Sequence, residues 1–84
     1  MVATRRRMLT LDCVGLLCPV PIYLTARKLA GLPAGTLLEV LCDDDVITQD
    51  LPSWCREIGH AIVEHRQEGA LHRYVVRKSE RVLP

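Results

Sequence analysis

The sequence GLLCPVP, residues 15–21, decides how the first part of the chain folds. Proline is well tolerated in the first turn of a helix, because the amide hydrogen that it lacks would have no intrahelical acceptor there. The residue before a proline is disfavoured in the α region. We therefore expect Cys18 to be the N-cap of a helix and Pro19 its first residue. Leu17 then packs on Ile22 as a hydrophobic staple.

Apolar patterning extends outward from this stretch in both directions. Leu9 and Leu11 alternate with polar residues, which predicts a strand over 8–13. Downstream, helical spacing predicts a helix over 19–30, with Thr25 away from the apolar stripe. The stripe expected to be buried consists of Ile22, Tyr23, Ala26, Leu29 and Ala30.

The rest of the chain is predicted to form three strands and a second helix. The strands are expected at 36–42, 61–67 and 71–78, the last two joined as a β-hairpin, and the helix at about 46–58. Pro52 would kink this helix from within. We therefore expect Asp50 to be the N-cap, with 46–49 as a looser lead-in.

The element order β-α-β-α-β-β predicts an α+β fold. We expect a two-layer α/β sandwich, with two helices on one face of a four-stranded mixed sheet. At 84 residues, the chain is expected to be one domain spanning 1–84. Its core covers about 8–78, and 1–7 and 79–84 form tails.

Composition narrows the class of protein. The net charge of +1 gives no general reason to expect direct nucleic-acid binding. No apolar run approaches the roughly 20 residues of a membrane span, and no apolar signal-peptide core follows Arg5-Arg6-Arg7. We therefore expect a cytoplasmic protein without a membrane span. The arginine run is either a contact for RNA or an acidic partner or, as we favour, a solvated end.

Cys18 is the leading candidate for chemistry. A sulfur nucleophile reacts as the thiolate, and the positive end of a helix dipole favours that form. We expect the amides of Val20 and Ile22 to point at the sulfur, which lowers the pKa of the thiol. The alternative is a helix start that carries cysteine by chance. Cysteine is a poor cap on stability grounds, so we favour the functional interpretation.

The other three cysteines are expected to pack in the interior. Cys42 and Cys55 lie on a predicted strand and helix, and Cys13 ends a strand. Cys13 has a functional alternative, as a resolving partner for Cys18 or a second sulfur acceptor. Structural disulfides and a zinc site are disfavoured by the expected compartment and the ligand spacing.

Acidic residues and histidines carry weaker signals. We assign Asp43, Asp44, Asp45 and Asp50 to a loop and a helix start, where acids complement the dipole. Metal binding, acid–base chemistry and partner docking by Asp43 or Asp44 are the alternatives. The three histidines share no metal-ligand spacing and are expected at the surface; they are His60, His65 and His72.

Residues 12–21, DCVGLLCPVP, resemble the signature of the TusA (SirA-like) family of small sulfur carriers. The resemblance covers roughly residues 9–78. It continues in a second block and a closing strand, at Asp43-Asp44, Thr48, Asp50, Leu51-Pro52, Cys55 and Tyr74 to Lys78. The chain departs from the pattern at Leu17, where many relatives place a basic residue, and this leaves the identity of its partners open.

The resemblance implies a sulfurtransferase-like carrier with the sandwich fold predicted above. Cys18 would hold sulfane sulfur as a persulfide, with Gly15, Pro19 and Pro21 completing the motif. Cys13, Asp43 and Asp44 are possible auxiliary residues. The implied donor is a cysteine desulfurase or a rhodanese-type protein. The implied acceptor protein serves tRNA thiolation, molybdenum-cofactor assembly or sulfur oxidation, and no metal or organic cofactor is required.

Two other functions stay open on the residues alone. One is a thiol–disulfide redox switch that uses Cys13 and Cys18. The other is a non-catalytic regulatory or RNA-binding module, which the near-neutral charge and the few aromatic residues disfavour.

Overall fold

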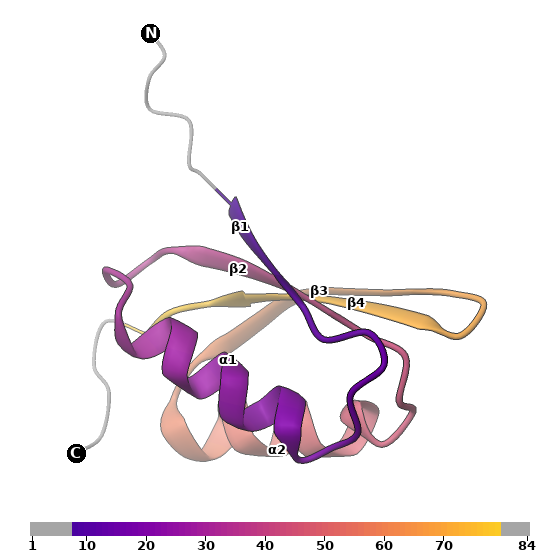
Figure 1. Ribbon diagram of the computed structural model, residues 1–84. Coiled ribbons are helices and arrows are strands. Elements are labelled where there is room, and N and C mark those ends of the chain that lie inside the picture. The colour runs from indigo at the N-terminus through magenta and orange to yellow at the C-terminus, as the bar shows by residue number, and fades with distance from the viewer. Residues whose placement is uncertain (1–7, 80–84) are drawn as a thin grey trace, which may run out of the picture.

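The computed structural model describes residues 8–79 and confirms the predicted element order (Figure 1). The elements are β1 (Met8–Asp12), α1 (Val20–Ala30), β2 (Leu37–Cys42), α2 (Ile47–Ile58), β3 (Ala61–Glu68) and β4 (Leu71–Arg77). The arginine run and most of the two predicted tails lie outside the described residues.

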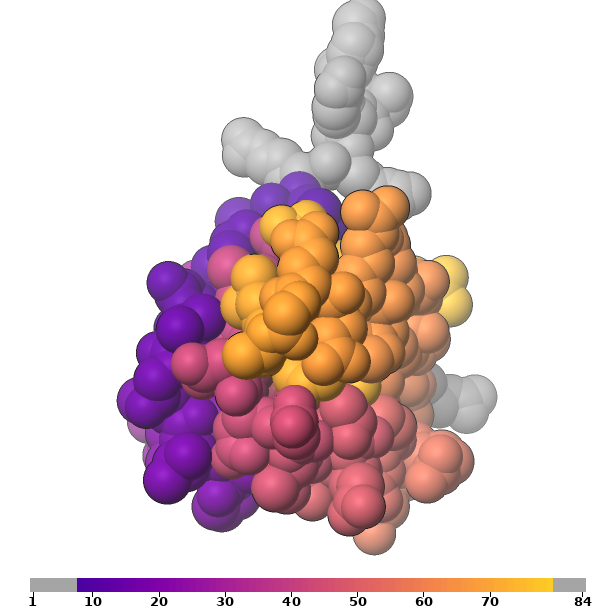
Figure 2. Space-filling view, turned by 90° about the vertical axis from the view of Figure 1, so that its right-hand side faces the viewer, coloured from indigo at the N-terminus to yellow at the C-terminus, as the bar shows by residue number. Residues whose placement is uncertain are grey.

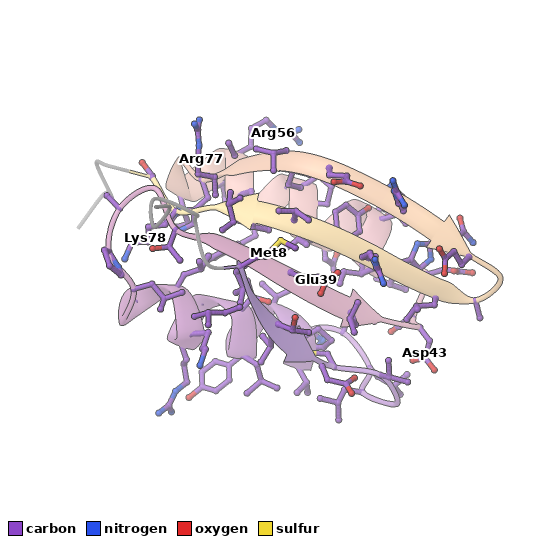
Figure 3. All side chains as sticks on the ribbon, turned by 90° about the horizontal axis from the view of Figure 1, so that it is seen from above. Met8, Glu39, Asp43, Arg56, Arg77 and Lys78 are labelled. Atoms are coloured by element: carbon purple, nitrogen blue, oxygen red, sulfur yellow. The ribbon has the colours of Figure 1, made fainter. Side chains whose placement is uncertain are left out.

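The four strands form one mixed sheet in the order β1-β2-β4-β3. β1 pairs with β2 in parallel, and the other two pairs are antiparallel. Both helices cover the same face, and Figure 3 shows the sheet from the side that they leave uncovered. The predicted two-layer sandwich is therefore confirmed. Because β1 and β2 are parallel, the loops that follow them emerge at the same end of the sheet.

The core lies between the sheet and the helices. Alternate residues of β2 are buried there, namely Leu38, Val40 and Cys42. α2 buries residues four apart, Ile47, Leu51 and Cys55. Cys13 is also fully buried, and all four cysteines are free thiols. The prediction that Cys13, Cys42 and Cys55 pack in the interior is confirmed.

α1 differs from its prediction in the face that it buries. Its buried residues are Pro21, Thr25 and Leu29, whereas Tyr23 is 59% exposed and Ala30 is exposed. Thr25 tolerates burial because its hydroxyl donates to the carbonyl of Pro21 at 2.7 Å. The predicted stripe was therefore wrong to include Tyr23 and Ala30 and wrong to leave out Thr25, because apolar residues were assumed to be buried and polar residues exposed.

The start of α1 also differs. Pro19 is the N-cap and Val20 the first helical residue, so Cys18 precedes the cap. The Cys18–Pro19 peptide bond is cis. Leu17 is 71% exposed, so the predicted staple does not form, and Leu16 packs against the core instead.

α2 spans the predicted range, but its first turn is regular helix and not a looser lead-in, and Pro52 lies in its interior. Asp50 is not its N-cap, because its amide donates to the carbonyl of Val46 at 3.0 Å, inside the first turn. Gly59 ends the helix in the left-handed conformation, with φ of 106°, and its amide donates to Cys55 at 2.8 Å.

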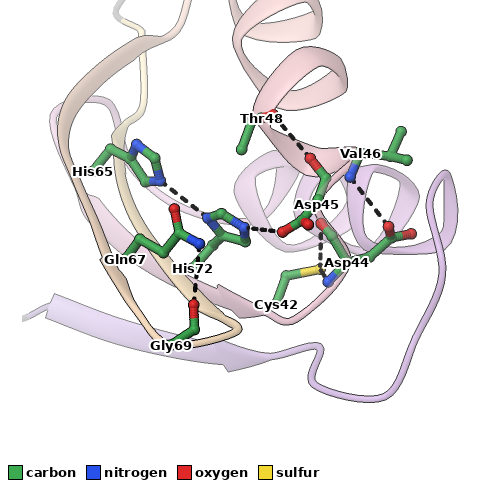
Figure 4. A network of polar contacts seen from close by, with 9 residues as sticks. All are labelled: Cys42, Asp44, Asp45, Val46, Thr48, His65, Gln67, Gly69 and His72. Carbon is green, nitrogen blue, oxygen red and sulfur yellow. Dashed lines mark hydrogen bonds and ion pairs between the residues drawn. The ribbon is translucent and has the colours of Figure 1, made fainter.

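Two of the three histidines are buried, contrary to prediction. His72 is 1% exposed and His60 is 9% exposed. The ring of His72 lies between two polar partners, 2.7 Å from the carboxylate of Asp45 and 3.2 Å from the ring of His65 (Figure 4). These contacts satisfy both ring nitrogens, which is what permits burial of an imidazole.

Candidate functional site

The candidate site lies where the loop after β1 meets the loop after β2. The amide of Cys13 donates to the carbonyl of Leu41 at 2.8 Å, which continues the contact between the strands beyond β1. The chain then turns, and the amide of Leu16 donates to the carbonyl of Cys13 at 3.1 Å. Figure 2 shows the early part of the chain, in indigo, against the segment that follows β2.

Two carboxylates of the second loop hold the first loop in place. Asp43 accepts a hydrogen bond from the amide of Gly15 at 2.9 Å, and Asp44 accepts one from the amide of Cys18 at 2.9 Å. The second oxygen of Asp44 accepts from the amide of Val46 at 3.1 Å. These amides hold the pKa of Asp44 below its ordinary value. Asp44 therefore ties the backbone of Cys18 to the start of α2.

Gly15 is required by the shape of the first loop. Its φ of 90° lies in the region that side chains rarely adopt, and open space surrounds the position where a Cβ would stand. The need for glycine is therefore conformational and does not come from crowding. Pro21 is buried in the first turn of α1, and Pro19 is exposed at the cap.

The backbone amides near Cys18 are arranged differently from the prediction. The amide of Val20 donates to the carbonyl of Leu17 at 2.9 Å, so it is engaged by the backbone and not by the sulfur. The amide of Tyr23 donates to Pro19 at 3.1 Å. The role predicted for the amide of Ile22 stays a prediction.

The thiol of Cys18 is less acidic than a free thiol. Burial, followed by the charges of Cys42, Asp44 and Asp50, raises its pKa from 9.0 to about 11. The prediction of a lowered pKa was therefore wrong. Asp44, which braces the loop, adds negative charge beside the sulfur, and a nearby like charge disfavours the thiolate. At neutral pH the resting thiol is protonated.

Among the four cysteines, Cys18 alone is partly exposed. Cys13 is fully buried beside it, and burial together with the charges of Cys42 and Asp12 raises its pKa as well. Within residues 8–79, no three His, Cys, Asp or Glu side chains are grouped so that they could hold a metal ion.

The sequence of this site matches a known family. The family model described as Sulfurtransferase TusA matches residues 9–78. The chain belongs to the TusA family. The sulfur carrier protein TusA of Pseudomonas syringae pv. syringae (strain B728a) is 40% identical to it over 68 residues, which are 81% of each chain.

A solved structure supports the same assignment. The crystal structure of a SirA-like protein from Desulfitobacterium hafniense superposes with a TM-score of 0.75 and is 26% identical in sequence. The match covers 88% of this chain and 100% of that chain. Neither helix of residues 8–79 is long and apolar enough to cross a membrane.

The surface beside Cys18 is apolar. Three exposed hydrophobic side chains lie within four residues of Cys18: Val14 at 48%, Leu17 at 71% and Val20 at 43%. Val46, 48% exposed, lies next to the brace formed by Asp44. Sequence reasoning identified Leu17 as a departure from the pattern but did not predict this group, because surface position depends on the loop contacts described above.

Proposed function

We propose that this protein of the TusA family is a sulfur carrier that holds sulfane sulfur as a persulfide on Cys18. One observation carries the proposal: Cys18 alone among the four cysteines is accessible, on a loop that Asp43 and Asp44 brace. A second protein needs to reach the sulfur, and the other three thiols are buried. The relative named as a sulfur carrier supports the same role.

Sulfur transfer onto Cys18 requires no added oxidant or reductant. The thiolate of Cys18 attacks the outer sulfur of a persulfide on the donor. A new S–S bond forms at Cys18, the S–S bond of the donor breaks, and the donor cysteine leaves as a thiolate that takes up a proton. Delivery is a second exchange of the same kind. A thiolate of the acceptor attacks the outer sulfur on Cys18, and Cys18 leaves as a thiolate.

The raised pKa of Cys18 suits a carrier that reacts only with its partners. A protonated thiol is a weak nucleophile and resists adventitious oxidation. On delivery, Cys18 is the leaving group, and a thiolate of high pKa leaves slowly. A cation or a proton donor on the partner would therefore accelerate both acceptance and release. We propose that the carrier acts in the cytoplasm, between a cysteine desulfurase or rhodanese-type donor and a protein acceptor.

Intact-mass measurement tests the proposal. The protein is incubated with a cysteine desulfurase and cysteine, and we expect a mass increase of about 32 Da for one added sulfur atom. Cys18→Ser is expected to lose this adduct. Cys13→Ala is the matched control, because it removes a neighbouring thiol that is fully buried, and it is expected to keep the adduct. An adduct that persists in Cys18→Ser would contradict the proposal.

The two alternative functions gain no comparable support. A redox switch needs Cys13 to reach Cys18, and Cys13 is 0% exposed. The family comparisons favour sulfur transfer over a regulatory or RNA-binding module.

A further inference from the structure

Exposed hydrophobic side chains gather around Cys18. Within residues 8–79, seven large hydrophobic side chains are exposed, and five of them lie on the Cys18 loop, in the first turn of α1 or on the loop after β2. These five are Val14, Leu17, Val20, Tyr23 and Val46. Hydrophobic side chains scattered singly over a surface are ordinary, whereas a group of them rimmed by polar residues marks a site of interaction.

Three of these side chains succeed one another along the start of α1 and the turn before it. The amide of Val20 donates to the carbonyl of Leu17 at 2.9 Å, so a single turn of backbone joins them. Val20 and Tyr23 are neighbours on the surface of α1, because side chains three residues apart on a helix lie side by side. We call Leu17, Val20 and Tyr23 the apolar stripe.

Tyr23 is held in place at the surface. The guanidinium group of Arg27 lies 5.8 Å from the centre of the Tyr23 ring and donates to its hydroxyl at 3.2 Å. An aromatic ring that is already fixed loses little conformational freedom on binding. Tyrosine and arginine are also enriched among the residues that dominate the binding energy of interfaces. The stripe therefore carries a preformed anchor for a partner.

Opposite charges flank the apolar stripe. Asp44 and Asp50 are among the charges that act on Cys18, at one end of the stripe. Arg27 lies at the other end, about 10 Å beyond Val20 along the helix axis. A partner that covers the stripe meets negative charge beside the sulfur and positive charge at the far end. A cation and a carboxylate at matching positions on the partner would fix its orientation.

We infer that the apolar stripe is the surface on which the sulfur-donor protein docks, through an apolar surface around the donor's own reactive cysteine. The inference rests on the sulfur-carrier function proposed above. Sulfur reaches the half-buried Cys18 only when the outer sulfur of the donor comes within bonding distance of its Sγ, about 2 Å. The donor then lies against Leu17 and Val20. An acceptor meets a sulfur that stands one S–S bond further out, so the donor makes the closer contact.

The rate of sulfur loading tests the docking surface. Leu17→Ser and the unmodified chain are loaded by a cysteine desulfurase with cysteine, and persulfide formation is followed by intact mass over a range of carrier concentrations. We expect kcat/KM of Leu17→Ser to fall at least about tenfold, through a higher KM, because one aliphatic side chain no longer becomes buried on docking. Leu17→Met keeps an apolar side chain and is expected to stay within about threefold of the unmodified chain.

Two controls separate docking from other effects. Val63→Ser removes another exposed hydrophobic side chain, from β3, and is expected to load like the unmodified chain. The rate of Leu17→Ser with 2-hydroxyethyl disulfide, which needs no docking surface, is expected to change less than about twofold. Equal losses in Leu17→Ser and Val63→Ser, or equal losses with the desulfurase and the small disulfide, would overturn the inference.

The remaining outcomes are also decisive. Loading of Leu17→Ser at the unmodified rate would remove the stripe from the docking surface. A dimer of the unmodified chain in sedimentation equilibrium that Leu17→Ser dissociates would assign the stripe to a second copy and overturn the inference. Absence of any adduct on the unmodified chain would instead refute the sulfur-carrier proposal, and the inference with it, so the two failures are distinguishable.

Discussion

Asp44→Asn keeps the shape of a side chain beside Cys18 and removes its charge. The Asp44 carboxylate accepts from the amide of Cys18 at 2.9 Å and is one of the charges that raise the pKa of this thiol from 9.0 to about 11. Burial and Cys42 both contribute more than Asp44, so Asp44 accounts for less than a third of the rise. We expect the pKa of Cys18 to fall by no more than about 0.7 in this variant.

The effect on reactivity follows from two opposing factors. A pKa lower by about 0.7 multiplies the thiolate fraction about fivefold at a pH well below the pKa. A less basic thiolate is also a weaker nucleophile, and a Brønsted coefficient of about 0.4–0.5 lowers the intrinsic rate about twofold. The expected net change is therefore a rate increase of at most about two- to threefold.

The assay is the second-order rate of Cys18 with a neutral disulfide, 2-hydroxyethyl disulfide, from about pH 7 to 9. Asp45→Asn is the matched control from the same loop, because the carboxylate of Asp45 lies 2.7 Å from His72 and is not among the charges that raise the pKa of Cys18. It is expected to leave the rate unchanged. In the unmodified chain the rate should rise about tenfold with each pH step of one. A plateau in this range would show that Cys18 is already ionised and would refute the reasoning.

Three further predictions concern the same loop. First, because Asp44 and Asp50 lie near Cys18, cystamine should react faster than an uncharged disulfide, and dithiodiglycolate more slowly, each relative to a free cysteine peptide. Added salt should reduce the difference between these relative rates. Equal relative rates would contradict the inference that negative charge lies near Cys18. Second, Gly15→Ala should lose about 1–2 kcal/mol in urea unfolding, because alanine is strained at a φ of 90°. Gly31→Ala, where φ is −96°, should lose less than about 0.5 kcal/mol, and similar losses in both would contradict the assignment. Third, the lowered pKa of Asp44 stabilises the fold above its ordinary value of 3.8, and this stabilisation is lost as the pH falls through the folded-state pKa. The urea midpoint should therefore fall less between pH 7 and about pH 3 in Asp44→Asn than in the unmodified chain, and equal falls would count against it.

The order and type of the elements could be predicted because local pattern and final burial agree. β2 alternates buried and half-buried residues, and α2 buries positions four apart, as their sequences indicate. The pattern failed to predict burial where a polar residue forms a hydrogen bond with a group that the fold places beside it. Thr25 is buried because the first turn of α1 presents the carbonyl of Pro21 to its hydroxyl. His72 is buried because Asp45 and His65 lie on either side of its ring.

Only part of the candidate site could be predicted, because the other part depends on contacts between distant segments of the chain. The position of Cys18 before a proline-initiated helix is a local feature, and the sequence shows it directly. The hydrogen bonds that Asp43 and Asp44 accept from this loop are long-range contacts. Asp43 is 28 residues from Gly15 along the chain, and Asp44 is 26 residues from Cys18. Their contact depends on the parallel pairing of β1 with β2, which no residue pattern within either loop encodes.

The pKa of Cys18 was predicted with the wrong sign because burial of the thiol, the largest cause of the rise, and the charge that this long-range contact places beside it both depend on the fold. A loop beside a helix start can be held by backbone donors or by acidic side chains. Here Asp44 occupies the amides of Cys18 and Val46, and the fixed loop therefore carries a negative charge next to its own nucleophile. Asp44 therefore both holds the loop and adds to the larger effect of burial on the reactivity of Cys18. A partner that places a cation against Asp44 would offset that charge and lower the pKa of Cys18. Activation would then accompany docking, and Cys18 would remain protonated between encounters.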